Sequence, residues 1–182
     1  MKFIKTSIPE VIVVEPQVFG DHRGFFLETW EKNKFKESGI DSDFVQDNHS
    51  KSSQGTLRGL HYQIQHPQGK LIRVIQGEIY DVAVDIRKNS STFGQWSGEY
   101  LTAENKKILW IPPGFAHGFY VITTTAEVCY KCTDYYFPQH ERSILWNDPE
   151  LAIDWPLINN EQPTLSRKDR EGVLLKDAEI FA

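Results

Sequence analysis

The stretch that decides the fold contains two strand-length segments, GTLRGLHYQ at residues 55–63 and KLIRVIQG at residues 70–77. A polar turn with a Pro and a Gly separates the two segments at residues 64–69. Leu, Ile and Val predominate in the second segment, which favours a β-strand. We therefore expect this stretch to form sheet structure, with the rest of the chain supplying a barrel around it.

Three side chains in this stretch can bind anions or transfer protons: Arg58, His61 and Lys70. They lie close together in sequence on predicted sheet structure, where packing alone gives no reason for them. The sequence therefore predicts a functional site here, with partners for His61 supplied from elsewhere in the chain.

Short strands separated by turn signals continue along the chain. The clearest pair runs from Leu71 to Arg87, with Gly77-Glu78 as the turn between its two strands. Other strands are predicted at residues 11–14, 25–30, 44–50 (turning into a polar loop), 95–102, 107–111, 117–124 and 126–134. Short helices are expected at residues 31–38 and after a capping box at Ser166–Asp169. Many short strands with little helix predict an all-β antiparallel sandwich or barrel.

The composition fits one domain covering residues 1–182, with 40% hydrophobic and 25% charged residues. The net charge of -5 gives no reason to expect a nucleic acid or an acidic membrane as partner. No apolar run is long enough to span a membrane. The N-terminal MKFIK lacks the apolar core of a signal peptide, so we expect a cytoplasmic protein.

Two cysteines, Cys129 and Cys132, have Cys-x-x-Cys spacing in a segment that is predicted to be a strand. Residues three apart in a strand point to opposite faces, so the pair cannot act as a redox motif that opens a helix. A zinc site needs four ligands, and two cysteines supply only half of them. We interpret both as ordinary reduced thiols.

The segment Pro-Pro-Gly-Phe-Ala-His at residues 112–117 resembles the second motif of the cupin family of small jelly-roll barrels. Gly55, five residues and His61 resemble the start of the first cupin motif, and Lys70, six residues and Gly77 resemble its end. This resemblance implies a cupin-type antiparallel jelly-roll barrel with a few short peripheral helices.

The first cupin motif departs from its metal-binding form at two positions. Metal-binding cupins have two His and a Glu there, whereas this chain has Gln63 at the second His position and Lys70 at the Glu position. A cationic Lys repels a divalent metal and removes a ligand. The resemblance therefore implies the fold, and the departures argue against a metal at this site.

A closer resemblance covers nearly the whole chain. FGDHRGFF at 19–26, RGLHYQ at 58–63, GFAHGF at 114–119 and LSRKD at 165–169 resemble the dTDP-4-dehydrorhamnose 3,5-epimerase family. The resemblance implies dTDP-4-dehydro-6-deoxy-D-glucose as substrate, in which both inverted carbons flank the C4 ketone. Removing a proton from either carbon gives an enolate, so the resemblance implies that no metal or redox cofactor is required. That chemistry needs a base on one face, an acid on the other and a positive group near the ketone oxygen.

The resemblance also implies a role for particular residues. His61 is the expected general base, since a neutral imidazole accepts a proton at physiological pH. Asp169 is expected to orient His61, although its place in the capping box explains it equally well without any function. Tyr130 is the expected acid on the opposite face, and Lys70 is expected near the ketone oxygen.

The remaining implied residues bind the substrate. Tyr136 matches a ring that stacks on the thymine. Arg23, Arg58 and Lys168 are expected on the diphosphate or the sugar, since Arg suits bidentate phosphate contacts. The other implied contacts are Phe26, Glu28, Gln46, Asn48, His117 and Glu141. For each of them a structural or surface role is the competing interpretation.

The function that we expect is inversion of C3 and C5 by a homodimeric epimerase, and the dimer is implied by the resemblance alone. An epimerase restricted to one carbon is the nearest alternative. A non-catalytic jelly-roll sugar binder would keep Tyr136 and the arginines, but it would have no use for a His61–Asp169 pair facing Tyr130. A metal-dependent cupin is a third alternative, which Lys70 opposes.

Overall fold

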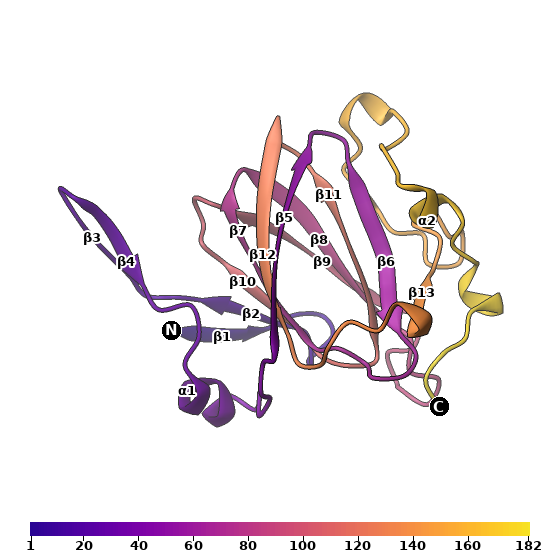
Figure 1. Ribbon diagram of the computed structural model, residues 1–182, viewed down its shortest axis with the longest axis horizontal. Helices are drawn as coiled ribbons and strands as arrows, with labels where there is room; N and C mark the ends of the chain where they lie inside the picture. Colours follow the sequence, from indigo (N-terminus) through magenta and orange to yellow (C-terminus); the bar gives the residue numbers. More distant parts are fainter.

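The computed structural model describes residues 1–182 and contains two antiparallel sheets that form a barrel (Figure 1). The six-stranded sheet has the order β1 (Lys2–Lys5), β2 (Ile12–Glu15), β10 (Ile108–Ile111), β7 (Lys70–Gln76), β12 (Thr125–Cys132) and β5 (Gln46–Ser53). The five-stranded sheet has the order β13 (Glu141–Ser143), β6 (Leu57–Gln63), β11 (Phe115–Val121), β8 (Glu78–Asp85) and β9 (Trp96–Thr102). This architecture confirms the predicted all-β jelly roll.

The barrel interior is filled by the inner faces of both sheets. Alternate residues of a strand face the same side, and accordingly Ile72 and Val74 of β7 pack against Ile79 and Ala83 of β8 in one buried cluster. A second cluster lies on the outer face of the five-stranded sheet and includes Trp146 of the C-terminal segment. The chain therefore buries both faces of the five-stranded sheet.

The link between β7 and β8 differs from the sequence-based prediction. The two strands belong to different sheets and do not pair, so the predicted turn at Gly77-Glu78 is a corner where the chain crosses between sheets. Gly77 has φ of +77°, and a Cβ at this position would lie 2.1 Å from the carbonyl oxygen of Thr125. Only glycine fits this corner. The strand predicted at residues 44–50 was expected to turn into a polar loop, whereas β5 begins at Gln46 and continues as a strand to Ser53.

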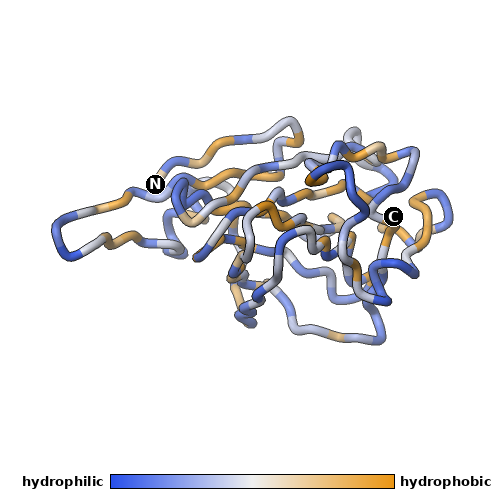
Figure 2. The backbone as a smooth tube through the Cα atoms, turned by 90° about the horizontal axis from the view of Figure 1, so that it is seen from above, coloured by the Kyte–Doolittle hydropathy of each residue, from blue (hydrophilic) through white to orange (hydrophobic).

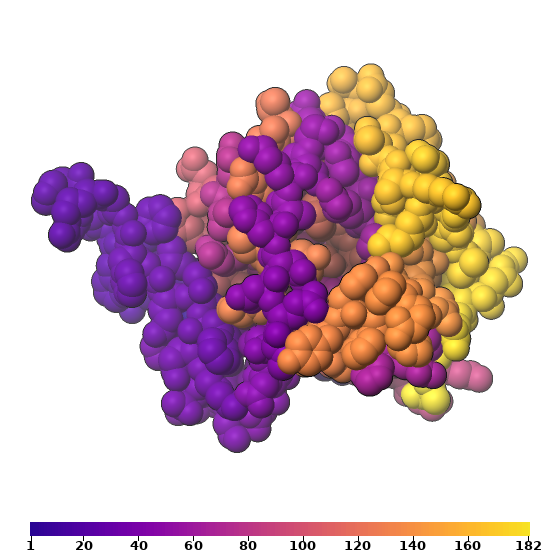
Figure 3. Space-filling model, viewed as in Figure 1, coloured from indigo at the N-terminus to yellow at the C-terminus, as the bar shows by residue number.

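A two-stranded hairpin, β3 (Val18–Asp21) with β4 (Gly24–Leu27), lies apart from both sheets. It projects from one end of the molecule in the ribbon and in the space-filling view (Figures 1 and 3). Figure 2 shows the same projection from above, with apolar and polar residues mixed along it. Phe19, Phe25 and Phe26 are 55%, 62% and 70% exposed on this hairpin. An isolated protomer therefore exposes aromatic surface that a folded chain normally covers.

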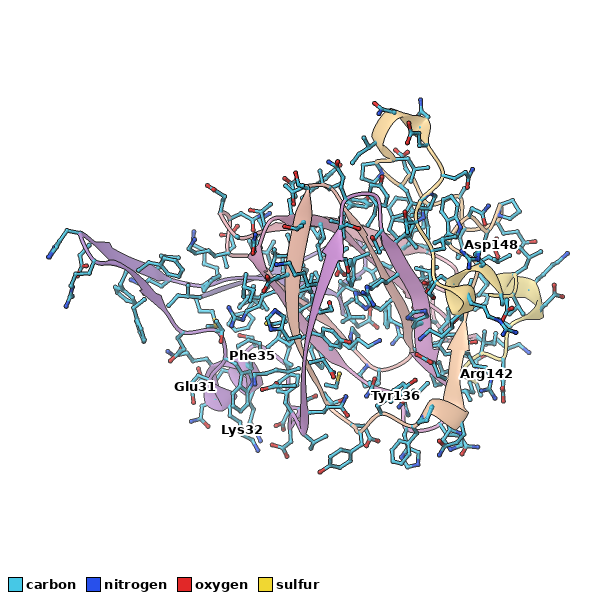
Figure 4. The ribbon with its side chains drawn as sticks, turned by 45° about the horizontal axis from the view of Figure 1, so that its top comes forward. Glu31, Lys32, Phe35, Tyr136, Arg142 and Asp148 are labelled. Atoms are coloured by element: carbon cyan, nitrogen blue, oxygen red, sulfur yellow. The ribbon has the colours of Figure 1, made fainter.

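The predicted helices are confirmed and lie outside the barrel. α1 (Lys32–Glu37) begins after the N-cap Glu31 and buries Phe35 (Figure 4). α2 (Arg167–Arg170) begins at the predicted capping box of Ser166 and Asp169. The remaining helical segments are 3-10 turns at η1 (Pro138–His140), η2 (Ile158–Asn160) and η3 (Leu175–Asp177). None of the helices has the length and apolar character needed to cross a membrane.

Candidate active site

A pocket of about 320 Å³ opens between the two sheets, and it brings together most of the site residues predicted from the sequence. The predicted residues in its wall are Gln46, Asn48, Arg58, His61, Lys70, His117, Tyr130, Tyr136, Glu141 and Lys168. Three further residues line it that the sequence analysis missed: Ser50, Gln68 and Phe119. Ser50 could have been found by alternation, because it follows Gln46 and Asn48 on the same face of β5.

The sheet register places the reactive side chains on opposite walls. His61 of β6 pairs with His117 of β11 in the five-stranded sheet. Tyr130 of β12 pairs with Asn48 of β5 in the six-stranded sheet. The predicted base and the predicted acid therefore approach the pocket from different sheets, as inversion at a carbon between them requires.

Asp169 lies behind His61 and is almost fully buried. Its Oδ1 is 2.7 Å from Nε2 of His61 and accepts a hydrogen bond from the backbone N–H of Gly59 at 3.1 Å. Its Oδ2 accepts hydrogen bonds from the backbone N–H and the hydroxyl of Ser166, at 3.0 and 2.6 Å. Nε2 of His61 makes no aligned hydrogen bond, so its 2.7 Å approach to Asp169 is a close electrostatic contact.

The environments of this pair favour a neutral imidazole beside a carboxylate. Burial lowers the pKa of His61, and the contact with Asp169 offsets this effect only in part. Burial opposes ionisation of Asp169, but the close contact with His61 and the hydrogen bonds from Ser166 and Gly59 together outweigh it and hold the pKa of Asp169 well below its usual range. Since Nε2 faces the carboxylate, Nδ1 is the ring nitrogen left to accept a proton.

Lys70 and Tyr130 are suited to charge stabilisation and proton donation. Burial lowers the pKa of Lys70, and Asp81 and Glu141 act on its ammonium only from a distance, without forming an ion pair. Burial raises the pKa of Tyr130, so its phenol keeps its proton at neutral pH. An ammonium without a counter-ion in a pocket wall is free to bind an oxygen that becomes negative during a reaction.

A second His–carboxylate pair lies in the same sheet. Nε2 of His117 is 2.9 and 3.0 Å from the two carboxylate oxygens of Asp81, which is fully buried on β8. The sequence analysis missed Asp81, although alternation with the apolar Ile79 and Ala83 placed an acidic side chain on the inner face. The pair fixes the ring of His117 at the pocket wall.

Three charged or phenolic side chains form a connected group at the pocket mouth. Glu141 accepts hydrogen bonds from Nζ of Lys168 at 2.7 Å and from the hydroxyl of Tyr136 at 3.0 Å (Figure 4 labels Tyr136). Arg58 donates from Nε to the hydroxyl of Ser52 at 3.0 Å and pairs with no carboxylate, so the rest of its guanidinium is available to a ligand. With Lys70, the pocket has more cationic than anionic groups.

Three residues predicted to bind substrate lie outside this pocket. Arg23 and Phe26 belong to the projecting hairpin and line a separate hollow there. Arg23 forms an exposed ion pair with Asp21 at 2.5 Å, and Glu28 forms one with Lys34 at 2.6 Å. A single protomer therefore does not bring these residues to the site.

The cysteines have the arrangement that strand geometry predicts. Cys132 is buried on the inner face of β12, Cys129 is partly exposed on the outer face, and both are free. β12 ends at Cys132, so Asp134 lies in the following loop, where it contacts His66 at 3.3 Å. The chain has no group of three or more His, Cys, Asp or Glu side chains placed to bind a metal ion.

The fold and this pocket define a cupin-type barrel equipped with acid–base groups on opposite walls. The family model described as dTDP-4-dehydrorhamnose 3,5-epimerase matches residues 5–177 of the chain. The chain belongs to the dTDP-4-dehydrorhamnose 3,5-epimerase family.

Relatives agree with this membership over the full length. The chain is 58% identical to a dTDP-4-dehydrorhamnose 3,5-epimerase of Pseudomonas aeruginosa, over 100% of this chain and 99% of the relative. A Legionella pneumophila epimerase solved in complex with dTDP-4-keto-L-rhamnose is similar with a TM-score of 0.94 and 54% identity, covering 98% of this chain and 94% of that one. A 3'-monoepimerase of Streptomyces bikiniensis in complex with dTDP-quinovose is similar with a TM-score of 0.87 and 32% identity, covering 94% of this chain and 87% of that one.

Proposed function

We propose that this protein inverts C3 and C5 of dTDP-4-dehydro-6-deoxy-D-glucose to give dTDP-4-dehydro-L-rhamnose. One observation favours this function over the alternative functions. A neutral imidazole, His61, lies against the carboxylate of Asp169 on one wall, while the protonated phenol of Tyr130 comes from the facing sheet. A sugar-binding protein has no need for a base and an acid on opposite sides of its ligand.

The proposed reaction begins with proton removal. Nδ1 of His61 takes the proton from the carbon beside the C4 ketone, and the electron pair of the C–H bond forms an enolate. The ammonium of Lys70 stabilises the negative enolate oxygen. Asp169 is a positioning residue, which orients the ring of His61 and stabilises the imidazolium once it forms.

Inversion is completed from the other side. Tyr130 donates its phenolic proton to the enolate carbon on the face opposite to His61, so the new C–H bond has the inverted configuration. The tyrosinate regains a proton from solvent and the imidazolium loses one, which restores both groups. The same sequence serves each of the two carbons, because both flank the same ketone.

The cationic groups of the pocket are proposed to bind the nucleotide. Arg58 and Lys168 suit the diphosphate, because both present donors to the pocket. Tyr136 is half exposed at the mouth and can offer its ring face to the thymine. Gln46, Asn48, His117 and Glu141 supply hydrogen-bonding groups around the sugar.

We also propose that the protein acts as a homodimer in which the site is shared. Arg23, Phe26 and Glu28 match substrate contacts of the family, yet they lie outside the pocket of their own protomer. The exposed aromatic rings of their hairpin would be covered if it reached the pocket of a second copy. The test is to mix Arg23→Ala with His61→Ala, each of which we expect to lose activity alone. Activity that returns on mixing, because one site becomes intact, supports sharing; a mixture that forms dimers and stays inactive contradicts it.

The test of the reaction is incubation of the protein with the keto sugar in deuterated water, followed by NMR. We expect deuterium at both C3 and C5 together with inverted configuration at both carbons. Label at one carbon alone would show a single-carbon epimerase, which is the kind of enzyme that the Streptomyces bikiniensis relative is. Binding without any label would show a sugar-binding protein and overturn the proposed function.

A further inference from the structure

The loop that carries Tyr136 is fixed by glutamine side chains. It follows β12 and precedes η1, and consecutive backbone groups of residues 134–137 bond to side-chain amides. Gln46 accepts a hydrogen bond from the N–H of Tyr136 at 2.9 Å, and Gln68 donates to the carbonyl of Asp134 at 2.8 Å. Gln63 bonds to the residues on both sides of Tyr136. The side chains of glutamines therefore replace the sheet partner that this backbone lacks.

Gln63 uses both ends of its amide on the loops beside the pocket. Its Nε2 donates to the carbonyl of Tyr135 at 3.1 Å and to that of His66 at 2.8 Å, and its Oε1 accepts from the N–H of Phe137 at 2.7 Å. The side chain is 4% exposed and, unlike Gln46 and Gln68, does not line the pocket. Any effect that it has on a ligand must pass through the loop.

The carboxamide of Gln63 suits this position, whereas a charged group would not. Two backbone carbonyls need a donor and one N–H needs an acceptor, and only a neutral carboxamide supplies both within one planar group. A carboxylate would face two carbonyl oxygens without a proton to share, and an apolar side chain would leave the backbone groups buried and unpaired. Gln63 lies where metal-binding cupins have their second His. Here both ends of its amide bond to the backbone of the loops instead.

We propose that Gln63 is a positioning residue for the nucleotide base, acting through Tyr136. By holding Tyr135 and Phe137, it fixes the direction in which the intervening ring is presented, with the Tyr136 hydroxyl 3.0 Å from Glu141. A ring that is already in place loses less conformational freedom when a base stacks on it. This inference rests on the proposed function, which assigns the ring of Tyr136 to the thymine.

The first test is to replace the amide and measure binding of dTDP by calorimetry. Gln63→Glu keeps the size of the side chain but removes both donated hydrogen bonds. We expect the affinity for dTDP to fall about tenfold. The kcat at saturating substrate should stay within about threefold, because no group at the reacting carbons changes. An unchanged affinity would overturn the inference.

A matched control is available on another loop. Gln54 also donates from Nε2 to a backbone carbonyl, that of Ile122 at 2.8 Å, but it is exposed and does not line the pocket. Gln54→Glu makes the same chemical change, and we expect dTDP affinity equal to that of the parent. A loss as large as that of Gln63→Glu would show a general effect of added charge and would overturn the inference.

The deciding test combines Gln63→Glu with Tyr136→Ala. If Gln63 acts through the ring, the double variant binds dTDP no more weakly than Tyr136→Ala alone. Losses that multiply would show that Gln63 acts independently of Tyr136 and would refute the proposal. Should Gln63→Glu fail to fold, Gln63→Met, of similar volume, takes its place in the same cycle. A parent that binds no dTDP at all would instead contradict the proposed function, so the two failures can be told apart.

Discussion

The carboxylate of Asp169 contacts Nε2 of His61 with one oxygen and closes the cap of α2 with the other. The sequence offered these as competing interpretations, an orienting group or a helix cap. Both interpretations fit the geometry, because one carboxylate oxygen contacts His61 and the other bonds to Ser166. The start of α2 and the strand of His61 are therefore fixed to each other by one side chain.

This geometry lets the two roles be separated by mutation. Asp169→Asn should lower kcat by about 10²–10⁴-fold, because an amide neither selects the ring tautomer nor stabilises an imidazolium. Ser166→Ala removes the cap hydroxyl, costs about 1 kcal/mol of stability and should leave the rate per folded molecule nearly unchanged. Initial rates and thermal unfolding of both variants check this. Equal rates for Asp169→Asn and parent would leave Asp169 as a cap only.

The pH dependence of the rate should follow the lowered pKa of His61. Because burial lowers this pKa from its ordinary value of 6.5, the acid limb of kcat/KM should have its midpoint below pH 6.5. The contact with Asp169 raises the pKa of His61, so Asp169→Asn should move the midpoint to still lower pH. A midpoint that moves upward in this variant would contradict the assignment.

The lowered pKa of His61 also predicts how the free energy of unfolding changes with pH. The unfolded chain takes up a proton on His61 near pH 6.5, whereas the folded protein does so only at lower pH. The contribution of His61 to the free energy of unfolding is therefore complete above pH 6.5 and decreases as the pH falls toward the folded pKa. Urea unfolding of the parent and of His61→Gln between pH 5 and 8 should show a smaller loss in the variant. Parallel curves would show no such linkage.

Tyr130→Phe should uncouple proton exchange from inversion. The base can still form the enolate, but only His61 or water can return a proton, and return from His61 restores the starting configuration. The variant should therefore place deuterium at C5 or C3 faster than it inverts that carbon. An NMR time course in deuterated water measures both in one sample. A fall of both by the same factor would exclude Tyr130 as the dedicated acid.

Lys70→Met should lower the activity and raise the thermal stability of the protein. Loss of the ammonium should lower kcat by about 10²–10³-fold, as for removal of one group that stabilises a developing oxyanion. Burial lowers the pKa of Lys70, so folding disfavours its charged form, and removing the charge should raise the thermal midpoint. Lys176→Met, at an exposed position, is the control and should change neither quantity. A less stable Lys70→Met protein would refute the reasoning from burial.

Dialysis against a strong chelator should leave turnover intact. Lys70 lies where a metal-binding cupin has a carboxylate, and the amide of Gln63 is bonded to backbone at both ends. Activity that is lost on dialysis and restored by one divalent ion would overturn this expectation.

Strand positions were predictable from the sequence because they depend on local alternation, whereas pairing was not. The segments on each side of Gly77 were correctly predicted as strands, but their pairing was wrong, since nothing local shows that a corner leads into another sheet. Most pocket residues followed from the family resemblance. Asp81 and Gln63 did not, because their roles depend on partners brought together only by the fold. The position of Arg23 outside the pocket likewise depends on how the hairpin leaves the barrel.

The contact between Gly59 and Asp169 spans 110 residues of sequence and has a consequence for synthesis. Every strand of both sheets precedes residue 144, so a nascent chain has all of its strands while the helix that orients the base, and the C-terminal segment that covers the five-stranded sheet, are still unmade. At about 5–20 residues per second, a ribosome needs a second or more to reach that helix. A chain truncated in this interval lacks both Asp169 and Lys168, so it has neither an oriented base nor all of the groups proposed to bind the nucleotide. Premature termination or proteolysis in this segment should therefore remove turnover and weaken nucleotide binding together.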